Sequence, residues 1–284
     1  MTFDANALAA LRSVYPEDIG LLRHEACRHP LLTLEALVGL AQRLPARNVE
    51  YYRGDVPIGI EGADTPSNGL SIADTIRRIE QCGSWMVLKF IEGDPAYRAL
   101  LHDALAPLRG IVGEATGEML KEQGFIFISS PGAVTPFHFD PEHNILMQIR
   151  GHKTMTLYPP ADPRFAGDES HEAFHAGGHR NLPWRDEFAG AGRPVELTPG
   201  DAVYVPVKAP HWVRNGSEPS ISLSITWRSE WSYHEEYAHG FNRLVRKVGV
   251  APASPGRFPE RNTAKSIAYR AARKAAHLIR PSGS

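Results

Sequence analysis

Residues 134–144 concentrate side chains that can bind a metal ion. They read VTPFHFDPEHN and hold two histidines, an aspartate, a glutamate and an asparagine. In a β-strand, residues i and i+2 point to the same face, so His138 and Asp140 would converge while the two phenylalanines face away. His143 lies at an odd spacing from His138 and would point to the opposite face. Two ligands do not make a site, so a third is expected on a neighbouring strand.

Residues 197–215, LTPGDAVYVPVKAPHWVRN, offer that third ligand. They combine a Pro-Gly-Asp turn, a strand and a short connection that ends at His211. Two histidines and one carboxylate on one face, with other coordination positions open, suit non-haem Fe(II) and oxygen activation. We therefore expect His138, Asp140 and His211 to bind iron.

Lys153 is a candidate for binding an anion. In KTMTLY, residues 153–158, the alternation places Lys153 on the same face as Met155 and Leu157, which is the expected interior. A lysine that points into a barrel is costly unless it meets an anion. The alternative is a lysine at the end of a strand that reaches solvent. Arg214 is a rival anchor, but alternation along its own strand should point it outward.

The elements that must position these residues are short strands rich in β-branched and aromatic residues and bounded by Gly, Pro and Asp. They are residues 125–130, 145–150, 154–158, 202–207 and 221–227. Because no helices lie between them, they predict an antiparallel barrel or jelly roll and not a parallel βαβ sheet. The polar, Gly- and Pro-rich residues 161–194 interrupt them, and so long a stretch is usually a lid or binding loop, or else disordered.

Helical patterns flank these strands. Residues 1–122 read as a mostly helical region that packs on the barrel, and residues 113–124 are expected to form its last helix. Residues 123–230 hold the predicted barrel, with 161–194 as an insertion loop. Helical spacing returns in residues 231–284, which we expect to form C-terminal helices.

The composition is that of a globular protein. The chain has 284 residues, of which 42% are hydrophobic and 22% charged. A net charge of −1 argues against a body that binds nucleic acid or membranes globally. Only Cys27 and Cys82 are present, so no disulfide framework is expected. The first 13 residues, MTFDANALAALRS, do not have the pattern of a secretory signal, and no apolar run reaches the roughly 18 residues that a membrane span needs. We expect a cytoplasmic protein.

Residues 131–158 and 199–213 resemble the JmjC-type, cupin-like oxygenases, and within them the asparaginyl-hydroxylase (HIF-inhibiting) branch. The first segment matches the frame Thr-Pro-x-His-x-Asp-x-x-x-Asn, followed by Gln-Ile-basic-Gly-x-Lys. The second, PGDAVYVPVKAPHWV, matches the family's Gly-Asp-x-x-Tyr-Ile-Pro strand that ends in the distal histidine. The two motifs stand in the family's order, and the resemblance spans residues 125–228.

The resemblance implies a fold and an activity. The fold would be a double-stranded β-helix, mainly β with flanking helices. The activity would be that of an Fe(II)/2-oxoglutarate-dependent dioxygenase that uses O2 to hydroxylate a protein side chain, peptide or small molecule and releases succinate and CO2. His138, Asp140 and His211 would be the iron ligands. Relatives that halogenate lack the carboxylate, so Asp140 favours hydroxylation.

Four further residues would form the 2-oxoglutarate pocket. By the same resemblance, Thr135 and Lys153 would hold the distal carboxylate of 2-oxoglutarate, and Asn144 and Thr226 would line the pocket. The chain departs from the hydroxylase branch at Thr226, where that branch has an asparagine. It departs again at residues 145–146, Ile-Leu, where the branch has two phenylalanines.

Two other functions stay open. One is a cupin that binds a metal and a small acid without oxygen chemistry. The other is a zinc metallopeptidase through His171-Glu172-x-x-His175, a motif that needs a helix so that both histidines share one face. The surrounding residues allow only a short helix, and the third histidine of the extended motif is due at Asn181. We favour a chance match.

The chain is basic from Arg257 onward, with seven lysines and arginines against Glu260 alone. Such a segment can contact nucleic acid or an acidic partner. The alternative is a helix that docks its apolar side on the body or on a second copy. We favour the docked helix. Because members of the family that the chain resembles dimerise through C-terminal helices, we expect a homodimer and no nucleic acid.

Overall fold

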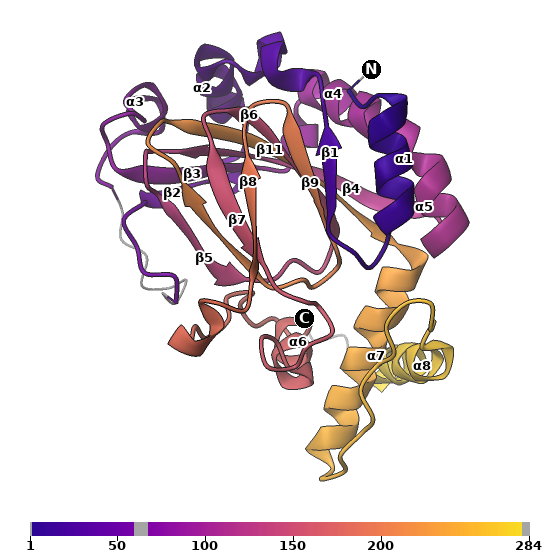
Figure 1. Ribbon diagram of the computed structural model, residues 1–284. Helices are drawn as coiled ribbons and strands as arrows, with labels where there is room; N and C mark the ends of the chain where they lie inside the picture. Colours follow the sequence, from indigo (N-terminus) through magenta and orange to yellow (C-terminus); the bar gives the residue numbers. More distant parts are fainter. Residues whose placement is uncertain (1, 60–67, 280–284) are drawn as a thin grey trace.

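Two antiparallel sheets form the centre of the molecule (Figure 1). The computed structural model describes residues 2–59 and 68–279. The larger sheet has the order β1 (Gly20–Arg23), β9 (Asp201–Val205), β6 (His143–Arg150), β11 (Ser220–Ser229), β4 (Met119–Ser129), β3 (Ser84–Lys89) and β2 (Val49–Arg53). The smaller sheet has the order β5 (Val134–His138), β10 (His211–Asn215), β7 (Lys153–Leu157) and β8 (Arg193–Leu197).

Eight α-helices flank these sheets within the described residues. They are α1 (Ala5–Val14), α2 (Leu34–Arg43), α3 (Ile72–Arg77), α4 (Pro95–Leu105), α5 (Arg109–Thr116), α6 (Asp168–Phe174), α7 (Glu230–Lys247) and α8 (Thr263–Ile279). The prediction of a mainly β fold with flanking helices is confirmed. None of the described helices is both long and apolar enough to cross a membrane.

Alternation along the strands divides the core into two parts. On β6, Leu146 packs into a cluster with residues of β7 and β8, between the two sheets. Its neighbours Ile145 and Met147 point the other way, into the cluster that the larger sheet shares with the N-terminal helices. The space between the sheets is therefore the barrel interior, and the helices cover the outer face of the larger sheet.

The helix expected at residues 113–124 is wrong. Helix α5 ends at Thr116, and Gly117 follows with φ +86°, a conformation that suits glycine. The chain then enters β4 at Met119, which pairs along its length with β11. Tertiary pairing therefore overrides the local helix preference of these residues. Residues 1–122 also supply β1, β2 and β3, so the boundary expected at residue 122 falls inside β4.

The stretch 161–194 is folded onto the barrel. It contains α6 and packs Phe165, Leu182 and Phe188 into an aromatic cluster with Phe137 and Phe139. This cluster anchors the stretch beside the strand expected to carry metal ligands.

The C-terminal residues form two packed helices, as the spacing predicts. Helix α7 follows β11 directly, and Ser229 and Ser232 cap its first turn reciprocally. Helix α8 crosses α7 closely at Gly240, where a Cβ would lie 2.4 Å from the ring of Tyr269. Arg280, one of the seven basic residues, lies outside the described residues.

Candidate active site

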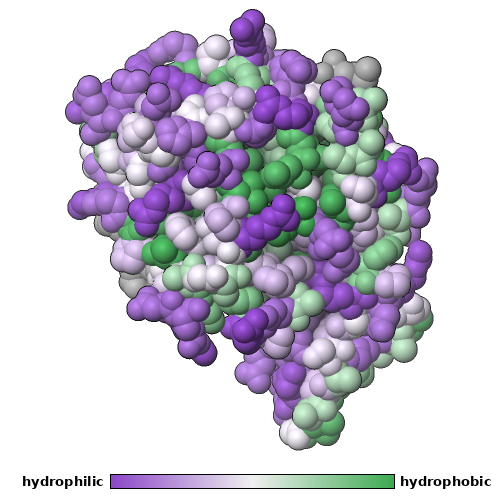
Figure 2. Space-filling model, viewed as in Figure 1, coloured by the Kyte–Doolittle hydropathy of each residue, from purple (hydrophilic) through white to green (hydrophobic). Residues whose placement is uncertain are grey.

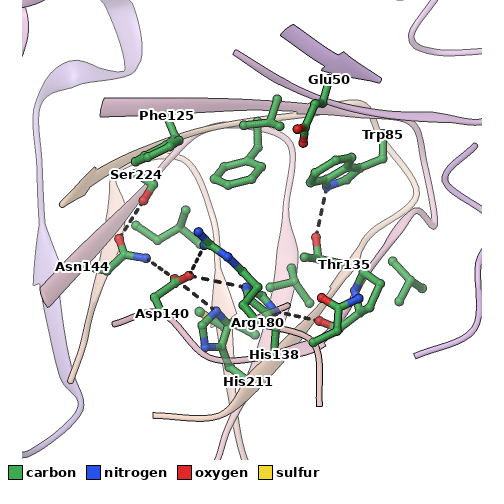
Figure 3. A pocket seen from close by; sticks show the side chains of 18 of the residues that line it. Glu50, Trp85, Phe125, Thr135, His138, Asp140, Asn144, Arg180, His211 and Ser224 are labelled. Carbon is green, nitrogen blue, oxygen red and sulfur yellow. Dashed lines mark hydrogen bonds and ion pairs between the residues drawn. The ribbon is translucent and has the colours of Figure 1, made fainter. Parts of the chain in front are cut away.

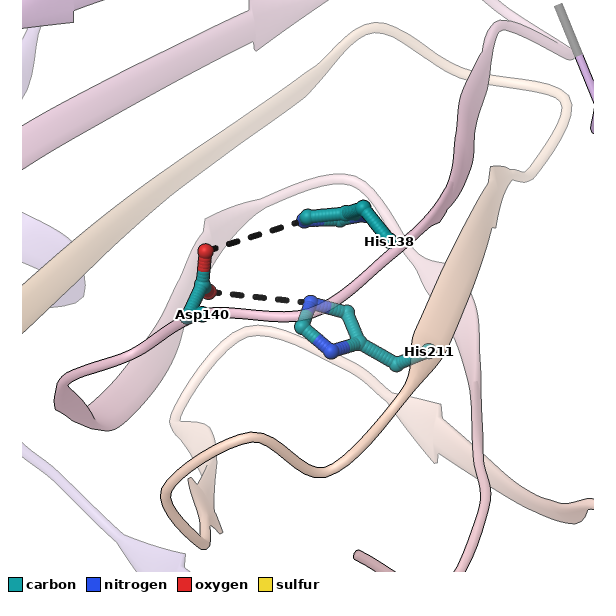
Figure 4. A group of neighbouring side chains, drawn as sticks. All are labelled: His138, Asp140 and His211. Atoms are coloured by element: carbon teal, nitrogen blue, oxygen red, sulfur yellow. Dashed lines mark ion pairs between the residues drawn. The ribbon is translucent and has the colours of Figure 1, made fainter. Parts of the chain in front are cut away.

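Strands β5 and β10 bring the three expected ligands together (Figure 4). His138 ends β5, His211 begins β10, and the two residues are direct partners in the antiparallel pairing. Asp140 follows just beyond β5. Nε2 of His138 lies 3.9 Å from Oδ1 of Asp140, and Nε2 of His211 lies 3.8 Å from Oδ2. The ligand atoms of the three side chains all lie within 4.8 Å of one another. Among residues 2–59 and 68–279, no other group of three or more His, Cys, Asp or Glu side chains could hold a metal ion in this way.

Backbone carbonyls orient both imidazoles. Nδ1 of His138 lies 2.7 Å from the carbonyl oxygen of Pro136, and Nδ1 of His211 lies 2.9 Å from that of Ala209. An Nδ1–H donated to each carbonyl leaves Nε2 unprotonated and directed at Asp140. Burial, together with the neighbouring His211, lowers the pKa of His138 to about 3. Both rings are therefore neutral at pH 7, the form that binds a metal.

The carboxylate of Asp140 is held ionised. Burial acts to raise its pKa, but Arg180 and the two histidines outweigh burial and leave the pKa at about 2. Asn144 Nδ2 donates to Oδ2 of Asp140 at 3.3 Å, and the side-chain Oδ1 of Asn144 accepts a hydrogen bond of 2.8 Å from the hydroxyl of Ser224. An ionised carboxylate between two neutral imidazoles is a donor set that fits a divalent transition metal with open positions.

A cavity of about 340 Å³ opens beside this group (Figure 3). Thr135, Asn144, Lys153 and Thr226 all line it, together with the three candidate ligands. Lys153 is 5% exposed and, as expected, shares the inward face with Met155 and Leu157. Burial lowers its pKa to about 7. Within the described residues its ammonium has no hydrogen bond or ion pair, so the cavity offers an unmatched cation.

The two threonine hydroxyls that line the cavity, those of Thr135 and Thr226, have different hydrogen-bond partners. Trp85 Nε1 donates to Thr135 Oγ1 at 3.2 Å, which leaves the threonine proton free to donate into the cavity. Thr226, on β11, is 3.4 Å from the carbonyl oxygen of Gln123. The polar side of β11 therefore faces the barrel interior, which its alternation alone left open. Leu146, at one position where the hydroxylase branch has phenylalanine, also lines the cavity.

Two alternative candidates lie outside the site: His143, considered as a metal ligand, and Arg214, considered as an anion anchor in place of Lys153. His143 is buried, with Nδ1 2.9 Å from the hydroxyl of Tyr204 and its ring stacked 5.5 Å from that of Trp227. Arg214 points outward over the ring of Trp212. Both agree with the expectation from strand alternation.

The HEAFH residues do not form a zinc site. Helix α6 ends at Phe174, before the second histidine. Glu172 instead binds Arg246, with both carboxylate oxygens 3.0 Å from Nε. The rings of His171 and His175 lie 5.2 and 6.1 Å from that of His239, and no metal-ligand group forms there within the described chain. The structure does not support the metallopeptidase alternative.

Arg180 reaches the site from the 161–194 stretch, and sequence reasoning missed it. Its Nη1 donates to Oδ1 of Asp140 at 2.6 Å. The backbone beside it pairs with the end of β5: Phe139 N–H donates to the Arg180 carbonyl at 3.3 Å, and Leu182 N–H to the Phe137 carbonyl at 2.8 Å. GGHRNLPW shows no strand periodicity; the only available signal was its place in a long polar excursion.

Strands β2, β3 and β4 supply the far wall of the cavity; the sequence predicted the strand at residues 125–130 but neither β2 nor β3. This wall is largely aromatic. Its members are Tyr52, Trp85, Phe125 and Phe127, with the ion pair of Glu50 and Lys89.

Comparisons with known proteins agree with this picture. Residues 96–233 match the family of the cupin-like domain. The Jumonji C domain-containing protein 5 of Drosophila melanogaster is 33% identical over 107 residues, which are 36% of this chain and 26% of that protein. Lysine-specific demethylase 8 of Danio rerio is 30% identical over 102 residues, 34% of this chain and 25% of that protein. The chain thus matches about a quarter of the length of each relative.

Solved structures show the same fold. The structure of Escherichia coli ycfD superimposes with a TM-score of 0.52 at 16% identity, over 99% of this chain and 70% of that one. The same ribosomal oxygenase in complex with cobalt and 2-oxoglutarate gives 0.51 at 15% identity, over 99% and 68%. Together with the family match, these results confirm the predicted double-stranded β-helix. Residues 96–233 of this chain therefore form a cupin-like domain.

Proposed function

We propose that this chain is an Fe(II)- and 2-oxoglutarate-dependent oxygenase that hydroxylates a protein side chain, peptide or small molecule. One observation carries the proposal: the two histidines and Asp140 face the same cavity as a buried lysine without an anionic partner. Bound iron would supply the activation of O2 and the oxidation of 2-oxoglutarate to succinate and CO2.

The residues of the chain have separate tasks in this proposal. His138, Asp140 and His211 hold the metal, and the two backbone carbonyls behind the imidazoles fix their orientation. Lys153 and Thr135 bind the distal carboxylate of 2-oxoglutarate. Since an anion favours the protonated amine, binding would also raise the lowered pKa of Lys153.

Asn144 and Thr226 line the same pocket in this proposal. Asn144 also holds Asp140 in place, because Ser224 fixes its amide. The asparaginyl-hydroxylase branch stays a prediction. A protein substrate is supported by the relative named lysine-specific demethylase 8.

The test of this function is succinate formation from 2-oxoglutarate. We expect it to require Fe(II) and O2 and to disappear in His138→Ala, while exposed His102→Ala retains it. Anaerobic Fe(II) with 2-oxoglutarate should give a visible charge-transfer band. Binding of metal and 2-oxoglutarate without succinate would instead favour the non-oxygenase cupin. The absence of both the band and turnover would refute the oxygenase.

We also propose a homodimer that associates through α7 and α8. Hydrophobic residues show at the lower tip of the molecule, the end of α7 (Figure 2). Exposed Leu244, Val248, Val250 and Ile267 all belong to these helices or follow α7 directly. Sedimentation should show a dimer that Val248→Asp with Ile267→Asp converts to monomer; a monomeric wild type would contradict it.

The two free cysteines fit a cytoplasmic location, which fractionation of the tagged chain would test.

A further inference from the structure

A buried ion pair lies behind the candidate metal ligands. Lys208, in the connection between β9 and β10, is 1% exposed, and Glu235 on α7 is 3% exposed. Nζ of Lys208 donates to Oε1 of Glu235 at 2.9 Å and lies 2.8 Å from Oε2. Removing two such charges from water offsets most of their attraction, so a pair this deeply buried is weak evidence for stability alone. Its position suggests another use.

The backbone of Lys208 touches the site directly. Its φ is +61°, a left-handed conformation that a residue with a Cβ adopts only when its surroundings enforce it. In this conformation its N–H donates to the carbonyl oxygen of Asp140 at 2.7 Å. The next residue, Ala209, offers the carbonyl that orients the imidazole of His211. Two consecutive residues thus contact two of the three candidate ligands.

Glu235 has a second partner. Its Oε1, which accepts from Lys208, also lies 3.1 Å from Nε2 of His239, one turn along α7. The ring of His239 packs 5.2 Å from that of His171, which in turn meets the ring of Phe139 edge-on at 4.8 Å. Phe139 stands between His138 and Asp140 in the chain. The first histidine of HEAFH therefore belongs to the packing behind the site.

We propose that Lys208 and Glu235 are positioning residues, whose ion pair ties the β9–β10 connection to α7 and holds Asp140 and His211 at metal-binding spacing before the metal arrives. The inference rests on the proposed metal site. Without the tie, the strained backbone at Lys208 relaxes, its hydrogen bond to Asp140 weakens, and the ligand atoms separate. The expected loss is in metal affinity, since partners behind the ligands typically contribute about 10- to 100-fold.

The experiment is a Co²⁺ titration followed by visible absorbance, with thermal unfolding measured on each protein. Lys208→Met removes the ammonium but keeps the stem and the backbone N–H, and should weaken Co²⁺ binding about 10-fold. Lys208→Met with Glu235→Gln leaves no unpaired charge. We expect this double variant to regain unfolding temperature over Lys208→Met while its Co²⁺ affinity stays low.

Arg228→Met is the matched control. Arg228 is also buried and pairs with Glu236 of the same helix at 2.9 Å, although the Glu236 side chain is 25% exposed. Arg228 hydrogen-bonds to none of the three candidate ligands. It should unfold at lower temperature and bind Co²⁺ as the wild type does. Should Lys208→Met fail to fold, the double variant decides.

Wild-type Co²⁺ affinity in the double variant would overturn the inference and leave the pair a structural one. A wild type that binds no Co²⁺ would overturn the metal site itself, a result distinct from any difference between variants.

Discussion

The guanidinium of Arg180 lies 2.6 Å from Oδ1 of Asp140, across 40 residues of sequence. Arg180 is the largest of the influences that lower the pKa of Asp140. The carboxylate between the two candidate ligand histidines thus has a cation beside it before any metal binds. The side chain of Arg180 is 44% exposed, so water screens the pair in part.

Arg180→Met should destabilise the metal-free protein by about 1 kcal/mol at pH 7, less than a buried hydrogen bond to a charged group because water screens the pair in part. Asp140 has a folded pKa of about 2, below its unfolded value of about 3.9. Its stabilising contribution is therefore complete above pH 4 and is lost as the pH falls toward 2. Urea unfolding with a chelator should show the gap between variant and wild type narrowing over that range. A constant gap would argue that the contact acts through packing alone.

Lys153→Met should weaken 2-oxoglutarate binding by about 2–3 kcal/mol, on the order of 30- to 150-fold in Kd, because a charge-assisted contact is lost. Metal affinity should not change. Since the folded pKa of Lys153 is about 7, its burial costs stability at any pH below its unfolded pKa, and the metal-free variant should unfold at higher temperature. Calorimetric titration measures the binding. Exposed Lys247→Met is the control, and full 2-oxoglutarate affinity in Lys153→Met would sink the anchor assignment.

Trp85→Phe should weaken 2-oxoglutarate binding by about 1 kcal/mol, because it removes one neutral hydrogen bond. The indole N–H occupies one lone pair of the Thr135 hydroxyl and so directs the hydroxyl proton to the cavity. Phenylalanine keeps most of the ring. Thr135→Val should lose at least as much, and the double variant should add little to Thr135→Val. Additive losses would show that the two side chains act independently.

The metal-free protein should lose stability as the pH falls below 6.5. Burial lowers the pKa of seven histidines in the fold. They are His24, His138, His143, His171, His175, His211 and His239. Each binds a proton more readily in the unfolded than in the folded state, so the free energy of unfolding decreases as the pH falls. Between pH 7 and 5.5, His138, His171 and His175, whose folded pKa values are about 2 to 3, each account for about 1 kcal/mol of lost stability, and the other four act in the same direction. Urea unfolding in chelator at several pH values measures the sum; stability independent of pH over this range would contradict it.

Local sequence was sufficient for the centre of the site. His138 follows the alternation of β5, Asp140 faces it from just beyond the end of that strand, and Lys153 follows the alternation of β7. A strand with one buried face permits only one register, so local residue order determines which side chains point inward. The third candidate ligand, His211, needed only one neighbouring strand.

The remainder depended on contacts that local patterns do not encode. Residues 119–124 favour a helix by composition, yet pairing with β11 makes them a strand. Arg180 enters through a segment without periodicity, and Trp85 reaches the cavity from β3, a strand near the edge of the larger sheet that no local pattern indicated. Such contacts follow from the packed fold as a whole.

The pairing between residues 137–139 and 180–182 also determines how the chain can be recombined. The N–H of Phe139 and the carbonyl of Phe137 find their partners in the excursion. An exchange of residues 161–194 for another loop would expose both groups unless the new loop supplied an extended turn at the same place. A chimaera that replaces the chain between β7 and β8 must therefore keep residues 180–182 or an equivalent extended segment. Without it, the end of β5 would lose its backbone hydrogen-bond partners.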